Sequence, residues 1–392
     1  MNTKLRIIVV FLIAFIGIFS YMSSQAQGTL VDQGVEYYNA QNYSKALECF
    51  TKAADNGNAE AQYYMGLLYY DGNAVLLDKH KATEWFQKAA NQKYAAAQCK
   101  LGEMYRDGDG VDKDYTKAKV FFEKAAKQDY VRAINILGNM YCNGEGVEQN
   151  YEKAVELYKK AVAFGYANSQ HNMGLMYNNG WGVPQDYEKA VKWYRKAADQ
   201  GFVNAQYSLG VRYEYGQGVQ QDYNEAVKWY REAAEQGYAY AQKNLGNMYY
   251  FGQGVERDYE KAVEWWRKAA DQGNAAAQYN LSLMYFDGQG VHRDYKEAVI
   301  WRRKAADQGF AMAQCFLGEM YDNGWGVSQD YEEAVIWYRK AADQEYAKAQ
   351  YNMAVMYFNG WGVHQDYEEA VKWYRKAADQ GYEDAINALK NF

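Results

Sequence analysis

The residues of this chain that are best suited to acid–base or metal chemistry are its four histidines and four cysteines. No two histidines have the three- or four-residue spacing that brings metal ligands onto one helical face. The cysteines are at least forty residues apart, which is neither the paired spacing of a zinc site nor the dense pattern of a disulfide-rich domain. We therefore predict no metal site and interpret the cysteines as small buried hydrophobic residues. These residues are His80, His171, His292, His364, Cys49, Cys99, Cys142 and Cys315.

Other catalytic patterns are also missing from the sequence. No serine is followed by a lysine three residues later, no paired-histidine metalloprotease motif occurs, and the glycine-rich segments lack the strand and lysine of a phosphate-binding loop. Carboxylates are abundant, but spacing alone does not pair them for acid–base catalysis. We predict no catalytic residue and no cofactor.

The residues that carry the function of this chain must be positioned by a repeat of thirty-six residues. Tyrosine recurs at this interval without insertion, alanine follows three residues after each tyrosine, and tryptophan usually follows after six. About ten units fill the chain and leave no room for a second domain. The repeated tyrosines are Tyr115, Tyr151, Tyr187, Tyr223, Tyr259, Tyr295, Tyr331 and Tyr367.

The unit at residues 203–238 shows why each repeat is predicted to fold as a helical hairpin. Apolar residues recur at helical spacing in two stretches, 205–213 and 223–234. Between them, Gly216 can adopt a positive φ without strain and so end the first helix. Asp222 can cap the second helix by accepting a backbone N–H.

Helices of about thirteen residues are marginal in water without tertiary packing, so one hairpin cannot stand alone. Stacked hairpins bury both apolar stripes, and each repeat then depends on its neighbours. The sequence therefore predicts an all-α solenoid of about ten helical hairpins, followed by a C-terminal capping helix.

The repeated residues resemble those of the Sel1-like repeat, a relative of the tetratricopeptide repeat, over nearly all of residues 29–392. The resemblance implies a right-handed α/α superhelix that acts as a scaffold or adaptor for protein complexes and, in bacteria, is often exported. In one unit the matching residues are Ala205, Gln206, Leu209, Gly210, Tyr213, Gly216, Gly218, Val219, Asp222, Tyr223, Ala226, Trp229, Tyr230, Ala233 and Ala234.

A cysteine-rich branch of this family, described as binding penicillin, suggests an alternative function. That branch ties adjacent helices with disulfides, but the positions of its cysteine pair hold Ala198 and Gln206 in this chain. The alternative is a hydrolase or binder directed at cell-wall material or β-lactams, and turnover of such compounds by the purified protein would favour it.

The N-terminus has the three-part pattern of an export signal. Lys4 and Arg6 precede an apolar run that ends at Phe19, and a polar stretch leads to Ala26. We predict cleavage of residues 1–26, with an uncleaved N-terminal anchor as the alternative, and hence a periplasmic or extracellular protein. The net charge of −6 would become −8 without these residues. An acidic balance argues against binding to nucleic acid or to an anionic membrane surface.

Domain boundaries follow from the phase of the repeat. Residues 27–57, with their short link between helices, are predicted to form an N-terminal cap that resembles a tetratricopeptide repeat. Residues 58–382 form the solenoid of Sel1-like repeats, and residues 383–392 supply a capping helix without a partner.

One face of the first helices varies between repeats and is the candidate binding site. In helical-hairpin solenoids the first helices line the concave side, where extended ligands lie. A ladder of asparagines there could clamp a peptide backbone, because an amide both donates and accepts, and tyrosines stand beside it. The alternative is that these are solvated positions repeated by duplication. The candidate ligand-binding residues are Asn172, Ser208, Asn244, Asn280, Asn352, Tyr207, Tyr279 and Tyr351.

Three tryptophans replace polar residues in the turns of the repeats, namely Trp181, Trp325 and Trp361. We interpret them as packing against a neighbouring turn, with a docking role as the alternative. The combined prediction is a non-catalytic exported scaffold that binds a protein or peptide partner through its concave face.

Overall fold

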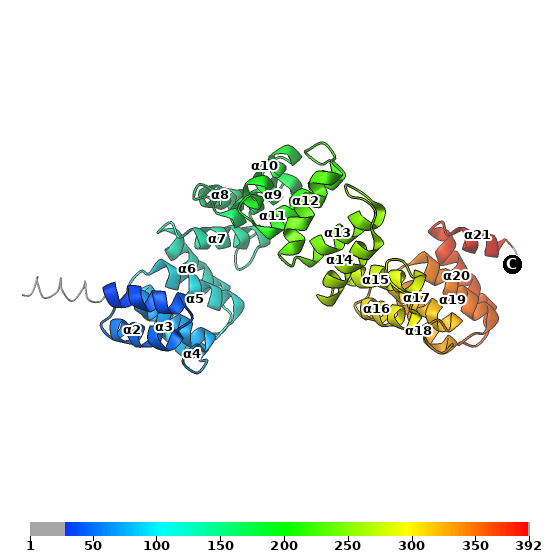
Figure 1. Ribbon diagram of the computed structural model, residues 1–392, viewed down its shortest axis with the longest axis horizontal. Helices are drawn as coiled ribbons and strands as arrows, with labels where there is room; N and C mark the ends of the chain where they lie inside the picture. Colours follow the sequence, from blue (N-terminus) through cyan, green and yellow to red (C-terminus); the bar gives the residue numbers. More distant parts are fainter. Residues whose placement is uncertain (1–27, 391–392) are drawn as a thin grey trace, which may run out of the picture. The chain divides into compact units, whose positions relative to one another are not determined.

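The computed structural model describes residues 28–390, and all regular structure in this range is helical (Figure 1). Residues 28–39 are helical, and a short link leads to the helix α2 (Tyr43–Asp55). The first helices of the following hairpins are α3 (Ala59–Asp71), α5 (Ala95–Asp107), α7 (Val131–Asn143), α9 (Ala167–Asn179), α11 (Val203–Tyr215), α13 (Ala239–Phe251), α15 (Ala275–Asp287), α17 (Ala311–Asn323) and α19 (Ala347–Asn359). The second helices are α4 (Lys79–Asn91), α6 (Tyr115–Ala126), α8 (Tyr151–Val162), α10 (Tyr187–Ala198), α12 (Tyr223–Glu235), α14 (Tyr259–Asp271), α16 (Tyr295–Asp307), α18 (Tyr331–Ala342) and α20 (Tyr367–Asp379). The last helix is α21 (Glu383–Leu389).

The helices are divided between two compact units, Met1–Asp186 and Tyr187–Phe392. Within each unit, the first helix of a hairpin packs against its own second helix, and that second helix packs against the first helix of the next hairpin. This alternation confirms the predicted all-α fold of stacked hairpins. The predicted export signal, residues 1–26, lies outside the described residues. None of the helices in residues 28–390 has the length and apolar character needed to cross a membrane.

The predicted helix signals act where the sequence places them. Asp222 accepts hydrogen bonds from the backbone N–H groups of Asn224 and Glu225 and so caps α12. Gly216 follows α11 in the left-handed conformation, with φ of 65°, and its N–H donates to the carbonyl of Arg212. A glycine stop therefore ends α11, and a side-chain cap begins α12, at the positions that the sequence predicts.

The core of most hairpins is built from alanines and a close contact between a glycine and an aromatic ring. The alanines that occupy the repeat position of Ala226, such as Ala262, are completely buried. A Cβ atom added at Gly246 would lie 2.5 Å from Cδ1 of Trp266, so a larger side chain there would displace the ring. The hairpin helices therefore approach closely because one of them carries no side chain at the contact.

A buried glutamine connects successive hairpins. In the first helix α13, Gln242 donates from Nε2 to the carbonyl of Ala234, at 3.0 Å, in the preceding second helix. Its Oε1 accepts a hydrogen bond of 2.8 Å from Nε2 of Gln272, at the end of α14. Because both amide atoms are used, burial of this side chain leaves no polar atom of Gln242 without a partner.

Replacing Gln242 with leucine is expected to reduce the free energy of unfolding by ~1–3 kcal/mol. The substitution keeps the size of the side chain but leaves the buried carbonyl of Ala234 without its donor. Urea denaturation followed by circular dichroism measures the change. Gln272→Leu is the control, since this partner is exposed and loses less. Equal losses in both variants would contradict the role of the buried amide.

Candidate functional site

The first helices of unit 2 form a connected layer, which we call the first-helix face. Side chains link each first helix to the next, so the layer runs from α11 to α19. The linking pairs are Tyr207 with Tyr240, Asn280 with Asn247, Tyr279 with Phe316, and Asn352 with Glu319. The first-helix face is thus continuous within the unit.

Large apolar side chains are unusually exposed on this face. Phe251, Tyr215 and Tyr240 are 64%, 63% and 56% exposed, and they exceed every other large apolar side chain described in unit 2. Phe251 and Tyr215 occupy the same position of successive repeats, at the ends of α13 and α11. Exposed rings grouped on one face are typical of surfaces that bind another molecule.

The predicted asparagines lie at the seams between adjacent first helices. In unit 2, Asn280 donates to Oδ1 of Asn247 at 3.3 Å, and Asn352 donates to Oε1 of Glu319 at 3.3 Å. Asn244 is only 8% exposed and hydrogen-bonds the hydroxyl of Tyr230. The amides therefore already have partners within the protein.

The other two members of the predicted ladder are also bonded within their own unit. In unit 1, Asn172 donates to Oδ1 of Asn135 at 3.1 Å and to Oδ1 of Asn139 at 3.0 Å. Ser208, in unit 2, donates to the backbone carbonyl of Asn204 at 2.8 Å. Asn172 thus contributes to the stacking of repeats, whereas the bond of Ser208 stays within its own helix. A direct role of the ladder in ligand binding stays a prediction.

The predicted tyrosines are half-buried against other rings. Tyr207 packs edge to face on Tyr238, with ring centroids 5.2 Å apart, and Tyr351 packs on Tyr382 at 5.3 Å. Burial raises the pKa of Tyr279 to about 12. Each of these rings supports the start of the next hairpin and leaves part of its surface on the first-helix face.

A pocket of about 430 Å³ opens on this face between α13 and α15. Its walls are largely aromatic: the Tyr250 ring lies 4.9 Å from the Phe251 ring, nearly perpendicular to it, and 5.3 Å from the Trp266 ring. Nε1 of Trp266 donates to Oδ1 of Asn247 at 3.1 Å, which fixes the indole. The pocket is lined by Asn247, Tyr250, Phe251, Trp266, Asn280, Leu283, Met284, Asp287 and Gln289.

Sequence reasoning found one of these lining residues, Asn280, as a ladder member. It also recognised that the positions of Asn247, Tyr250 and Phe251 vary between repeats, but it selected neighbouring positions as ligand contacts. Variation at helical spacing identified the face on which this pocket opens, and the missing information was the depth at which each side chain lies.

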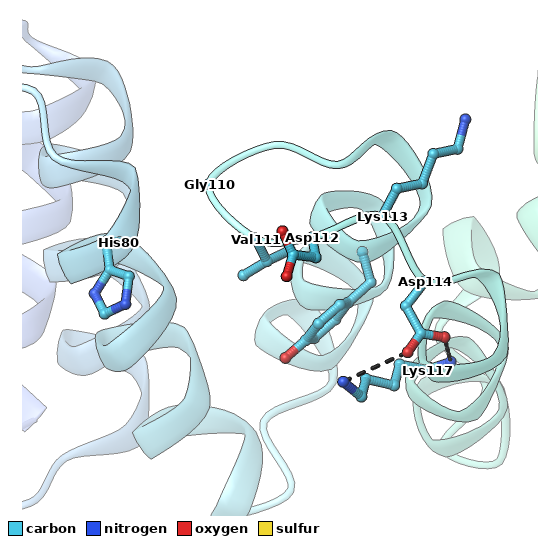
Figure 2. Close-up of a pocket in the computed structure, with 8 residues that line it drawn as sticks. His80, Gly110, Val111, Asp112, Lys113, Asp114 and Lys117 are labelled. Atoms are coloured by element: carbon cyan, nitrogen blue, oxygen red, sulfur yellow. Dashed lines mark hydrogen bonds and ion pairs between the residues drawn. The ribbon is translucent and has the colours of Figure 1, made fainter.

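A second cavity, of about 790 Å³, lies in unit 1 around the turn between α5 and α6. Figure 2 shows Asp114 bonded to Lys117, with His80 apart from them. Asp114 caps α6 by accepting from the backbone N–H of Lys117 at 2.9 Å, and this bond lowers the pKa of its carboxyl group. Asp114 and Lys117 therefore serve helix capping and a surface ion pair at this cavity.

The histidines and cysteines are not assembled into a reactive site. No group of three or more histidine, cysteine, aspartate or glutamate side chains that could hold a metal occurs in residues 28–390. Burial lowers the pKa of His171 to about 4 and raises the pKa of Cys99 to about 12, so both side chains are neutral at pH 7. All four cysteines are free; Cys99 and Cys315 are buried, as predicted, while Cys49 and Cys142 are half-buried.

The turn tryptophans pack against rings of a neighbouring repeat. Trp181 stacks on Tyr151 at 5.5 Å, and Trp361 stacks on Tyr331 at 5.4 Å. Trp325 meets Phe286 edge to face at 5.2 Å. These contacts agree with the packing interpretation of the three residues.

Comparison with known proteins identifies the repeat. A family model described as Sel1 repeat matches ten segments, residues 33–58, 59–94, 95–130, 131–163, 167–202, 203–238, 239–274, 275–310, 311–346 and 347–382. A comparison with curated proteins gives no match.

Two solved structures are similar over most of their length. One is c5321, a protective antigen of uropathogenic Escherichia coli strains with an SLR fold. It is 34% identical, with a TM-score of 0.64, over 86% of this chain and 80% of that protein. The other is a Sel1 repeat protein from Oxalobacter formigenes, 35% identical, with a TM-score of 0.61, over 79% of this chain and 90% of that protein.

Proposed function

Because the chain belongs to the Sel1 repeat family, whose members are generally protein-interaction scaffolds, we propose that it binds a protein or peptide partner along the first-helix face of unit 2. No chemical step is required of such a protein. The partner is held by contact with side chains that the repeat packing leaves uncovered.

The exposure of aromatic side chains on this face is the observation that carries the proposal. Phe251, Tyr215 and Tyr240 keep more than half of their surface in contact with solvent, although each belongs to a helix whose opposite side is buried. An aromatic ring can bury ~150–250 Å² and often supplies a large share of the binding free energy at an interface. A partner lying along the first helices would cover these rings in succession.

We further propose that the protein works in the periplasm or outside the cell. The charged start, the apolar run and the polar end of residues 1–26 support this location.

Replacing Tyr215 and Tyr240 together with serine is expected to reduce recovery of the partner by about tenfold or more. The purified protein would be immobilised and exposed to an extract of the native host, and captured proteins would be quantified by mass spectrometry. Both side chains are exposed, so the thermal unfolding midpoint should change little.

The matched control replaces Ile300 and Ile336 with serine. These side chains are each 47% exposed and lie on the second helices α16 and α18. Equal recovery by the wild-type protein and the tyrosine double variant, or equal loss in the isoleucine control, would contradict binding at the first-helix face.

A further inference from the structure

We propose that the pocket between α13 and α15 binds a basic side chain, lysine or arginine, of a partner polypeptide. This inference rests on the proposed function and specifies the chemistry of the partner at one point of the first-helix face. It is carried by the composition of the pocket and by two equivalent places in the same chain.

The composition of the pocket suits a cation. Asp287 is the one charged residue among the nine that line it, and no lysine or arginine lines it. The rings of Tyr250, Phe251 and Trp266 converge there, and the face of an aromatic ring attracts positive charge. In addition, Oε1 of Gln289 is buried without a hydrogen-bond partner among the described residues. The lining therefore offers a carboxylate, ring faces and an amide acceptor, all of which favour a ligand with N–H donors and positive charge.

The equivalent place five repeats toward the N-terminus already contains a cation. Lys100 occupies the position of Asn280, and its ammonium lies 3.7 Å from the ring centroid of Tyr70, which occupies the position of Tyr250. Asp109, at the position of Gln289, accepts a hydrogen bond of 2.5 Å from the hydroxyl of Tyr70. In that seam the chain supplies two ammonium groups of its own: Lys100 lies over the Tyr70 ring, and Nζ of Lys79 bonds Oδ1 of Asp109 at 2.5 Å.

The equivalent place in the following repeat contains a guanidinium group. Arg302 occupies the position of Trp266 and lies 4.9 Å from the ring of Phe316 and 5.9 Å from the ring of Phe286. Burial lowers its pKa to about 10, and the charge of Asp287 is among the effects that oppose this shift. Two other seams thus fill the same space with their own cation, whereas the seam between α13 and α15 leaves a pocket with the rings and the carboxylate in place.

The proposal is tested with a defined probe and saturation-transfer NMR, which detects weak binding. The probes are the peptide Gly-Ser-Gly-Lys-Gly-Ser-Gly and its analogues with arginine or norleucine at the central position. We expect the lysine and arginine peptides to bind about tenfold or more tightly than the norleucine peptide, because norleucine has a similar shape but no charge.

Two substitutions test whether this pocket is responsible. Asp287→Asn should weaken binding of the basic peptides by about tenfold, whereas Asp271→Asn, an exposed carboxylate at the end of the second helix α14 outside the pocket, should not. Asn280→Lys should abolish probe binding, because the introduced ammonium can take the place over Tyr250 that Lys100 takes over Tyr70. Asn280→Gln, which adds length without charge, should keep binding.

The outcomes separate this inference from the proposed function. Equal binding of the norleucine peptide, or unchanged binding by Asp287→Asn or Asn280→Lys, overturns the cation pocket. If Asn280→Lys still captures the host partner while the Tyr215 and Tyr240 double variant does not, the first-helix face stands and the pocket's role in recognition is overturned. Loss of capture in both, together with selective binding of the basic peptides, supports both proposals.

Discussion

Replacing Trp266 with alanine is expected to lower the free energy of unfolding by ~3–5 kcal/mol, the range found when a large aromatic side chain is removed from a core. Trp266 is 3% exposed and fills the space that Gly246 leaves on α13. Its Nε1 also donates to the carbonyl of Lys243 and to Oδ1 of Asn247, both at 3.1 Å. Alanine would remove the ring contacts and both hydrogen bonds, and would leave a cavity between the two helices of the hairpin.

The adjacent Trp265→Ala is the matched control for this experiment. Trp265 is only half-buried at the edge of the core, and the ammonium of Lys268 lies 4.0 Å from its ring centroid. Denaturant titration gives the loss in each variant, and hydrogen exchange locates it. Exchange should increase first in α13–α15 and only later in α19 and α20, because a solenoid repeat contacts only its neighbours. Equal losses for the two tryptophans, or a uniform increase in exchange across unit 2, would contradict this account.

Replacing Ser282 with glycine and Arg302 with phenylalanine together is expected to raise the free energy of unfolding by ~1–3 kcal/mol. In most hairpins a glycine faces an aromatic ring, as where a Cβ on Gly102 would lie 2.6 Å from the Phe122 ring. The hairpin of α15 and α16 instead pairs Ser282 with Arg302, whose Nε donates to the serine hydroxyl at 3.0 Å. Arg302 is 1% exposed, and its Nη2 has no hydrogen-bond partner among the described residues.

The stabilisation comes from removing a buried cation that is only partly satisfied. Burying an ionised group costs several kcal/mol unless its donors are paired, and phenylalanine carries no such cost. Introducing glycine inside a helix offsets ~0.5–1 kcal/mol of the gain. The double variant should therefore unfold at higher denaturant concentration than the wild-type protein.

The single variants of this pair are expected to have the opposite effect. Arg302→Phe alone would press a ring against the Ser282 side chain and destabilise by ~1–3 kcal/mol. Ser282→Gly alone would leave Nε of Arg302 buried without its acceptor, at a similar cost of ~1–3 kcal/mol. A double-mutant cycle measured by urea denaturation gives the coupling between the two positions. The account is contradicted if the free-energy changes of the two single variants add up to that of the double variant, or if the double variant is less stable than the wild-type protein. In either case Ser282 and Arg302 would not act as a pair that replaces the usual glycine and aromatic ring.

The sequence by itself determined the repeating unit of this protein. Tyrosine and alanine in strict thirty-six-residue phase, glycine stops such as Gly216 and caps such as Asp222 specify short helical hairpins, and these signals act locally. Hairpins of this length must stack to be stable, so the solenoid followed from the same pattern. The face that is free to vary between repeats was also readable, because helical periodicity fixes the direction of every side chain relative to the buried stripe.

Only the tertiary structure decided which residues of that face are available to a partner. Asn244 and Asn280 belong to the face that varies between repeats, but Asn244 bonds to Tyr230 and Asn280 bonds to Asn247. Phe251, which lies on the same helix as Asn244, remains largely exposed. The repeat phase places Arg302 at the core position of Tyr230 and Trp266, but only the structure shows that Ser282, across the hairpin, accepts a hydrogen bond from its guanidinium group. Helical periodicity gives the direction of a side chain on its own helix. The exposed fraction of that side chain depends on the side chains of the next hairpin, and these differ from one repeat to the next.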